Sequence, residues 1–221
     1  MVDMRRRSPE PPVGMPQIQH KPGLANEMLR ELAPLLAEEG IDLDNIDVAN
    51  IDALQRALDR AVERRNMELF SPLGATRDLA LTTLRLVVQA VLDGATALAG
   101  ALLDRVQPES PDNTVATVAS CVGISLGLLD DWLSGNAADA PVDLRQHTLL
   151  PAGHWHGKRA ATDILVLARK GKAFATLDKL LIRQGGPQVL AGSTLALAAA
   201  INAWAQRSGT PPADLIKTLI R

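Results

Sequence analysis

The chain has 221 residues, of which 47% are hydrophobic and only 2% aromatic, with no tyrosine and one cysteine. This length and apolar share suffice for a sizeable core without metals or disulfides, and a single cysteine excludes an internal disulfide. The net charge of −2 conceals an asymmetry, because residues 1–22 carry +2, residues 23–134 carry −10 and residues 135–221 carry +6. Opposite charges on two parts of one chain predict that the parts dock on each other, or that a basic face serves an acidic partner.

Composition and the placement of proline and glycine predict an all-α fold with four segments. Aliphatic residues must form the core, and leucine and alanine favour packed helices over a β-sandwich, whose sheets use aromatic and β-branched residues. We expect a disordered, proline-rich tail (1–23), an acidic helical domain (24–134), a linker or loop rich in histidine, glycine and proline (135–157) and a basic helical subdomain (158–221). The expected architecture is a helical bundle around two long apolar helices, with a smaller basic helical C-terminal part.

The acidic domain is predicted to contain four helices. Apolar spacing predicts helices over residues 24–39 and 51–70. A third helix over 76–106 is apolar outside one narrow polar stripe, so we expect it to run through the middle of the domain. A fourth, over 114–133, follows Asp112 as its cap, and its small residues would let another helix backbone approach closely.

The basic part is predicted to contain three or four shorter helices. Glycines end the first two, over 160–170 and 172–184, and a longer alanine-rich helix covers 187–207. Two prolines open a last helix over 213–221. The apolar run 164–167 is compatible with a strand as well as with a helix.

A cluster of cations in the basic part is the main candidate binding surface. Between residues 158 and 183 seven basic residues face only Asp163 and Asp178, which gives this stretch a net charge of +5. We interpret the cluster as a partner- or phosphate-binding surface, although pairing with the acidic part of the same protein would account for it equally well. Its members are Lys158, Arg159, Arg169, Lys170, Lys172, Lys179 and Arg183. The spacing places the last three on roughly one side of a helix.

A second candidate is a metal site around three histidines of the linker. A zinc site needs three or four ligands, and the nearest acidic candidates in sequence are Asp143 and the two aspartates at the end of the 114–133 helix. The spacing matches no metal-binding signature, so the alternative is a loop that Trp155 anchors while its histidines face water. The candidate ligands are His147, His154, His156, Asp130 and Asp131.

The sequence carries no local signature of catalysis. No phosphate-binding glycine loop and no nucleophile elbow is present. Cys121 lies in an apolar run without basic neighbours, which predicts a buried hydrophobe and not a nucleophile. The sequence therefore favours a non-enzymatic protein, and no cofactor is predicted.

These observations favour a cytoplasmic interaction or adaptor protein that docks an acidic or apolar partner or associates with itself. The first alternative is a nucleic-acid-associated regulatory protein that uses the basic C-terminal helices. The second is a metal-dependent enzyme that uses His147, His154 and His156. An anionic membrane surface, bound by the basic helices and Arg5–Arg7, ranks behind these. Charged and polar residues interrupt the longer apolar runs, so no transmembrane segment is predicted.

Overall fold

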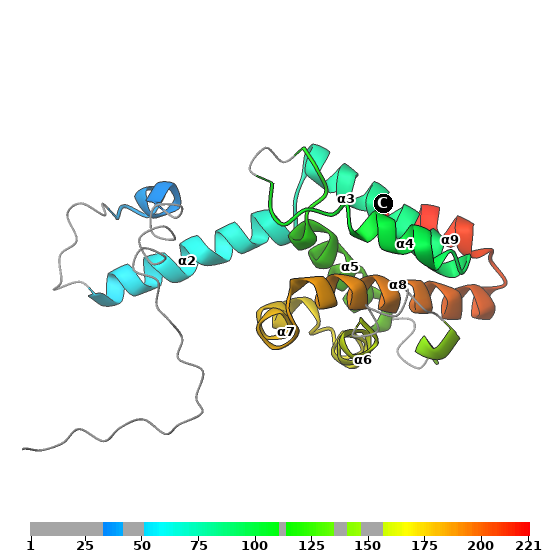
Figure 1. Ribbon diagram of the computed structural model, residues 1–221. Helices are drawn as coiled ribbons and strands as arrows, with labels where there is room; N and C mark the ends of the chain where they lie inside the picture. The colour runs from blue at the N-terminus through cyan, green and yellow to red at the C-terminus, as the bar shows by residue number, and fades with distance from the viewer. Residues whose placement is uncertain (1–32, 42–50, 111–113, 135–140, 147–156) are drawn as a thin grey trace, which may run out of the picture. The chain divides into compact units, whose positions relative to one another are not determined.

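The computed structural model describes residues 33–41, 51–110, 114–134, 141–146 and 157–221. Within these ranges the regular elements are helical and no strand occurs, so the predicted all-α class is confirmed (Figure 1). The α-helices are α2 (Ile51–Phe70), α3 (Gly74–Leu92), α4 (Thr96–Leu103), α5 (Val118–Leu133), α6 (Gly157–Ala168), α7 (Leu177–Gln184), α8 (Gly186–Ser208) and α9 (Pro212–Leu219). Two short 3-10 helices are η3 (Leu144–Gln146) and η4 (Phe174–Thr176). The chain groups into two compact units, residues 1–62 and 63–221.

The first unit contains a small apolar cluster. Leu36, in the helical stretch 33–38, packs with Ala57 and Ala61 from the first part of α2. The Nε atom of Arg60 lies 2.6 Å from a carboxylate oxygen of Glu39 in an ion pair. The predicted tail 1–23, the start of the 24–39 helix and the residue before α2 lie outside the described residues.

The second unit is built around α8. Fourteen residues of this helix are buried, including an unbroken run from Val189 to Ile201. In Figure 1, α8 lies between α3, α4 and α9 on one side and α6 and α7 on the other. α5 also packs on α8. The rings of Trp132 in α5 and Trp204 in α8 have centroids 6.4 Å apart. The sequence does not predict this central place of α8; it predicts one for the 76–106 helix, whose first part, α3, packs on α4, α5, α8 and α9.

The composition of α8 fits this central position. Among the described helices, α8 alone is long and apolar enough to cross a membrane, with a mean hydropathy of 1.3 over its most apolar 18 residues. However, 78% of that window is buried inside the protein. A core helix passes the same test of length and composition, so the test is weak evidence for a membrane span.

Small residues bring α6 and α8 into close contact. A Cβ atom built on Gly192 of α8 would lie 2.4 Å from the Cβ of Ala160 and 2.8 Å from the backbone nitrogen of Ala161. One on Gly157 of α6 would lie 3.1 Å from the Cβ of Ala191. Gly192 leaves no room for a side chain and Gly157 leaves little, so the two backbones meet at the distance that close packing of small residues permits.

The predicted 76–106 helix is divided in two. α3 ends at Leu92 and α4 begins at Thr96, because Gly94 between them adopts a left-handed conformation with φ of 69° that ends the first helix. The 114–133 helix also starts later than predicted, at Val118. Thr117 is extended, with φ of −101°, and its side-chain oxygen accepts a hydrogen bond from the backbone N–H of Ser120, which caps α5.

The helices of the basic part follow their predicted order. The run 164–167 lies within α6 and is helical. The predicted 172–184 helix is divided into η4 and α7, whereas α8 and α9 begin and end within one or two residues of the predicted bounds. The predicted 135–157 segment is described only at residues 141–146 and at Gly157.

The change of charge along the chain falls inside the second unit. α3 and α5 belong to the acidic segment (23–134), yet they pack directly on α8, which belongs to the basic segment (135–221). The guanidinium Nε of Arg85 in α3 donates to the backbone oxygen of Ile220 at 2.7 Å, and Arg77 donates to the backbone oxygen of Arg221 at 3.1 Å. The two charge segments thus share one apolar core, and side chains from the first bind backbone groups of the second.

Candidate functional site

The structure distributes the predicted basic cluster over α6, α7 and their connection. Lys158 and Arg159 are exposed in the first turn of α6. Arg169, Lys170 and Lys172 surround the turn after α6, and Arg169 is half-buried. Lys179 and Arg183 are exposed one turn apart on α7. Lys172 precedes η4, so it does not lie on the helix that carries the other two members of its predicted face.

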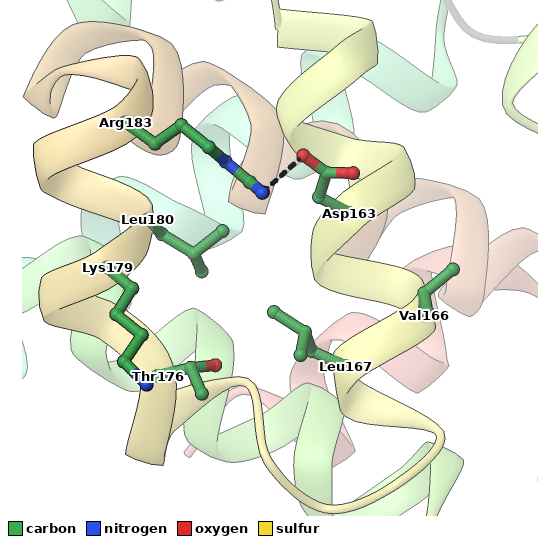
Figure 2. A pocket seen from close by; sticks show the side chains of 7 residues that line it. All are labelled: Asp163, Val166, Leu167, Thr176, Lys179, Leu180 and Arg183. Atoms are coloured by element: carbon green, nitrogen blue, oxygen red, sulfur yellow. Dashed lines mark hydrogen bonds and ion pairs between the residues drawn. The ribbon is translucent and has the colours of Figure 1, made fainter.

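Two of the predicted cations line a cavity between α6 and α7, which we call the α6–α7 groove. It has a volume of about 350 Å³ (Figure 2). The groove is lined by Asp163, Val166, Leu167, Thr176, Lys179, Leu180 and Arg183. Figure 2 shows Leu180 of α7 and Leu167 of α6 on opposite walls, while Arg183 reaches across one end toward Asp163. The groove therefore combines apolar walls with cationic groups that come from α7.

Asp163 receives two hydrogen bonds at the end of the groove. An Nη atom of Arg183 and the amide Nε2 of Gln184 each lie 2.7 Å from the same carboxylate oxygen. The Arg183 side chain is 60% exposed and that of Asp163 34% exposed, so water screens the ion pair. Such a pair contributes about 0–1 kcal/mol, so little stability is lost when it breaks. Lys179 makes no ion pair with any described residue.

The acidic members of the predicted metal site have different surroundings. Asp130 is half-buried, and its two carboxylate oxygens accept hydrogen bonds of 2.9 Å from the backbone N–H groups of Ala173 and Phe174. Burial raises the pKa of Asp130, these two hydrogen bonds lower it, and the charge of Asp131 raises it further. Asp131 itself is exposed. Asp130 thus has a structural role, since it caps η4 from the end of α5.

The histidines of that predicted site cannot be placed against these aspartates. His147, His154 and His156 lie outside the described residues, as does Trp155. Among the residues that the structure describes, no group of three or more histidine, cysteine, aspartate or glutamate side chains is arranged to hold a metal ion. The metal site stays a prediction of the sequence.

Cys121 is fully buried in the first turn of α5. Burial raises the pKa of its thiol to about 12, because the thiolate would lose its hydration there. A reactive thiolate requires an accessible, electropositive site, so this environment agrees with the predicted role as a small hydrophobe.

A second and larger cavity, which we call the large cleft, was not predicted from the sequence. It has a volume of about 700 Å³ and lies among the end of α2, the α4–α5 connection, α7 and the start of α8. Its walls include Phe70, Leu103, Val106, Val118, Leu181 and Leu190. Asp104 and Glu109 are the charged side chains that line it. These residues come from five separated stretches of chain, so no spacing in the sequence could have revealed the cleft.

Comparison of the chain with protein-family models, with curated proteins and with solved structures finds no match.

Proposed function

We propose that the protein is a non-enzymatic interaction or adaptor protein that docks an acidic, amphipathic segment of a partner protein in the α6–α7 groove. The observation that carries the proposal is the combination of apolar walls with Lys179 and Arg183 in one cavity. An amphipathic helix inserts its apolar side chains into such a groove, and acidic residues on its flank pair with the cations at the rim.

Exposed apolar side chains next to the groove support the same partner class. Ile182 of α7 is 87% exposed, and Val166, on the α6 wall, is 52% exposed. A volume of about 350 Å³ is at the lower end for a small-molecule site, which spans about 300–1,000 Å³. A groove of this size with apolar residues around it suits a few anchoring side chains of a larger partner.

The groove suits an acidic protein better than a nucleic acid. Two cations and the carboxylate of Asp163 give the groove only a small net positive charge, whereas binding along a nucleic-acid backbone relies on several cations that each neutralise a phosphate. None of the residues that line the groove is aromatic, so it offers no platform for stacking bases. The apolar walls would face the hydrated backbone of a nucleic acid without any gain from burial.

Selection from a displayed library of random helical peptides, with binding affinities measured by fluorescence anisotropy, tests the proposal. The enriched peptides should be acidic and should repeat apolar residues at helical spacing. The charge reversal Lys179→Glu should weaken their binding about tenfold or more, which corresponds to about 1.4 kcal/mol. Lys158→Glu is the matched control, because Lys158 is an equally exposed cation of α6 outside the groove, and it should change the affinity less than twofold.

Results of that selection, of oligonucleotide titrations and of measurements of the oligomeric state could each contradict the proposal. Peptides that lack acidic residues, or that bind the Lys179→Glu variant equally well, would show that the groove is not the site. Binding of duplex or single-stranded oligonucleotides with a steep salt dependence, lost in Lys179→Glu, would favour the nucleic-acid alternative. A concentration-dependent dimer, broken by the same substitution, would identify a second copy of the chain as the occupant.

A further inference from the structure

The large cleft has the volume and lining of a small-molecule site. Its volume of about 700 Å³ lies well within the range of about 300–1,000 Å³ that is typical of such sites. The buried side chains of Val106, Ala119 and Leu190 contribute to its walls, together with partly buried Leu103 and Leu181. An apolar body placed there would remove much of its surface from water, at about 25 cal/mol per Å².

The charged groups of the cleft are both carboxylates. Asp104 is exposed at the carboxyl end of α4, and Glu109 follows in the α4–α5 connection. Glu109 lies 3.9 Å from a guanidinium nitrogen of Arg65, and the Glu109 side chain is 53% exposed, so this ion pair is long and screened. The carbonyl end of α4 adds a partial negative charge next to Asp104.

The start of α8 also lines the cleft, and its partial positive charge acts against these carboxylates. A helix N-terminus carries about half a unit charge and the Arg65 guanidinium beside Glu109 adds one positive charge, whereas the two carboxylates carry two full negative charges. Pro187, in the first turn of α8, has no N–H to offer an anion. The balance at the rim is therefore negative, and the charge complementary to it is a cation.

We propose that the large cleft binds a small organic cation, whose apolar body lies between α5, α7 and α8 and whose ammonium group lies beside Asp104 and Glu109. The ammonium group stays at the exposed rim and keeps part of its hydration, so the desolvation cost that opposes buried charges is small there. Selection between ligands with the same apolar body then depends on the sign of their charge.

A matched pair of probes tests this site. The two probes, 4-phenylbutylamine and 5-phenylvalerate, share one phenylbutyl body and carry opposite charges. Saturation-transfer NMR and isothermal titration against the full chain should show the amine binding at least about tenfold more tightly than the acid. Asp104→Lys should abolish or reverse this preference. Asp93→Lys is the matched control, since Asp93 is an exposed aspartate at the carboxyl end of α3 that does not line the cleft, and it should leave the preference unchanged.

A substitution that fills the cleft tests the contribution of the apolar walls to binding separately from that of the charged rim. Val118→Trp should weaken both probes at least about tenfold, because the larger side chain occupies the space between the walls. Equal affinity of the two probes, no measurable binding of the amine, or unchanged affinity in Val118→Trp would overturn the proposal. Asp104 is exposed, so its replacement leaves the core intact and tests the charge preference even where the tryptophan variant is poorly folded.

Binding of the amine to the large cleft does not depend on the function proposed for the α6–α7 groove. Lys179→Glu, which should impair peptide docking, should leave the affinity for 4-phenylbutylamine unchanged, since Lys179 does not line the large cleft. Loss of amine binding in that variant would place the probe in the groove and would count against the cleft.

Discussion

Gly192 in α8 and Ala160 in α6 are packed so closely that a Cβ atom on the glycine would lie 2.4 Å from that of the alanine. This contact joins the central helix to the helix that carries one wall of the α6–α7 groove. Gly192→Ala should therefore lower the free energy of unfolding by about 1–3 kcal/mol, as overpacking of a close-packed core does. Denaturant unfolding followed by circular dichroism measures this change.

Gly127→Ala in α5 is the matched control for that substitution. A Cβ atom at Gly127 would have no other atom within 4 Å, and the residue lies in the interior of a helix. The replacement should be neutral or should stabilise the protein by up to about 1 kcal/mol, because alanine loses less backbone entropy than glycine on folding. Equal destabilisation by the two substitutions would contradict the close contact at Gly192.

The burial of Asp130 predicts a pH-dependent contribution to stability. The pKa of Asp130 in the folded protein is raised above its ordinary value of 3.8, chiefly by burial. The folded state therefore keeps the carboxyl proton of Asp130 to a higher pH than the unfolded state does. The stabilisation that comes from this difference is present at low pH and is lost as the pH rises through the pKa of the folded state. The free energy of unfolding of the wild type, relative to Asp130→Asn, should fall as the pH rises from about 3.

Asp131→Asn provides a graded comparison for this titration. The charge of Asp131 is one of the causes that raise the pKa of Asp130, but it acts less than burial does. Its removal should reduce the pH-dependent difference without abolishing it, as measured by denaturant unfolding at a series of pH values. A difference that grows with pH would contradict the raised pKa.

The helix that forms the core was the best predicted part of the fold. Pro187 near its start and Gly209 after its end, where the glycine has φ of 69°, fix its bounds locally. By contrast, Gly94 lies in an apolar run and is compatible with a kink, with close packing or with a break, and only the tertiary structure decides among them. The division between η4 and α7 had no local signal, because the residue that caps η4 is Asp130, more than forty positions away.

Of the α6–α7 groove, only the side formed by α7 could be predicted from the sequence. Lys179 and Arg183 are four residues apart, so helical periodicity alone placed them on one face. The opposite wall, with Asp163 and Leu167, comes from α6, and the pairing of the two helices depends on the packing of small residues against α8. Charge composition could indicate a basic surface, but it could not indicate the apolar walls of the groove beside it.

Arg85 in α3 holds the segment that follows α9 in place. Its guanidinium Nε donates to the backbone oxygen of Ile220 at 2.7 Å, and Ile220 is fully buried. Arg85→Met keeps the length of the side chain but leaves that carbonyl without its charged donor, which should cost about 1.5–3 kcal/mol. Hydrogen exchange measured by mass spectrometry should show faster exchange in α9 than in the wild type. Unchanged exchange in α9 would show that apolar packing alone fixes this segment.

The thiol of Cys121 should be almost inert in the folded protein. With its pKa raised from 9.0 to about 12, roughly one thiol in ten thousand is ionised at pH 8, compared with about one in ten for an ordinary thiol. Reaction with a thiol-specific disulfide reagent at pH 8 should therefore be at least about a thousandfold slower in the native protein than in the denatured protein, where one thiol per chain reacts at once. The thiol is also fully buried, so the native reaction should accelerate with mild denaturant, because it needs local opening of α5. A fast stoichiometric reaction without denaturant would instead show an accessible thiolate, and Cys121 would have to be treated as a candidate nucleophile.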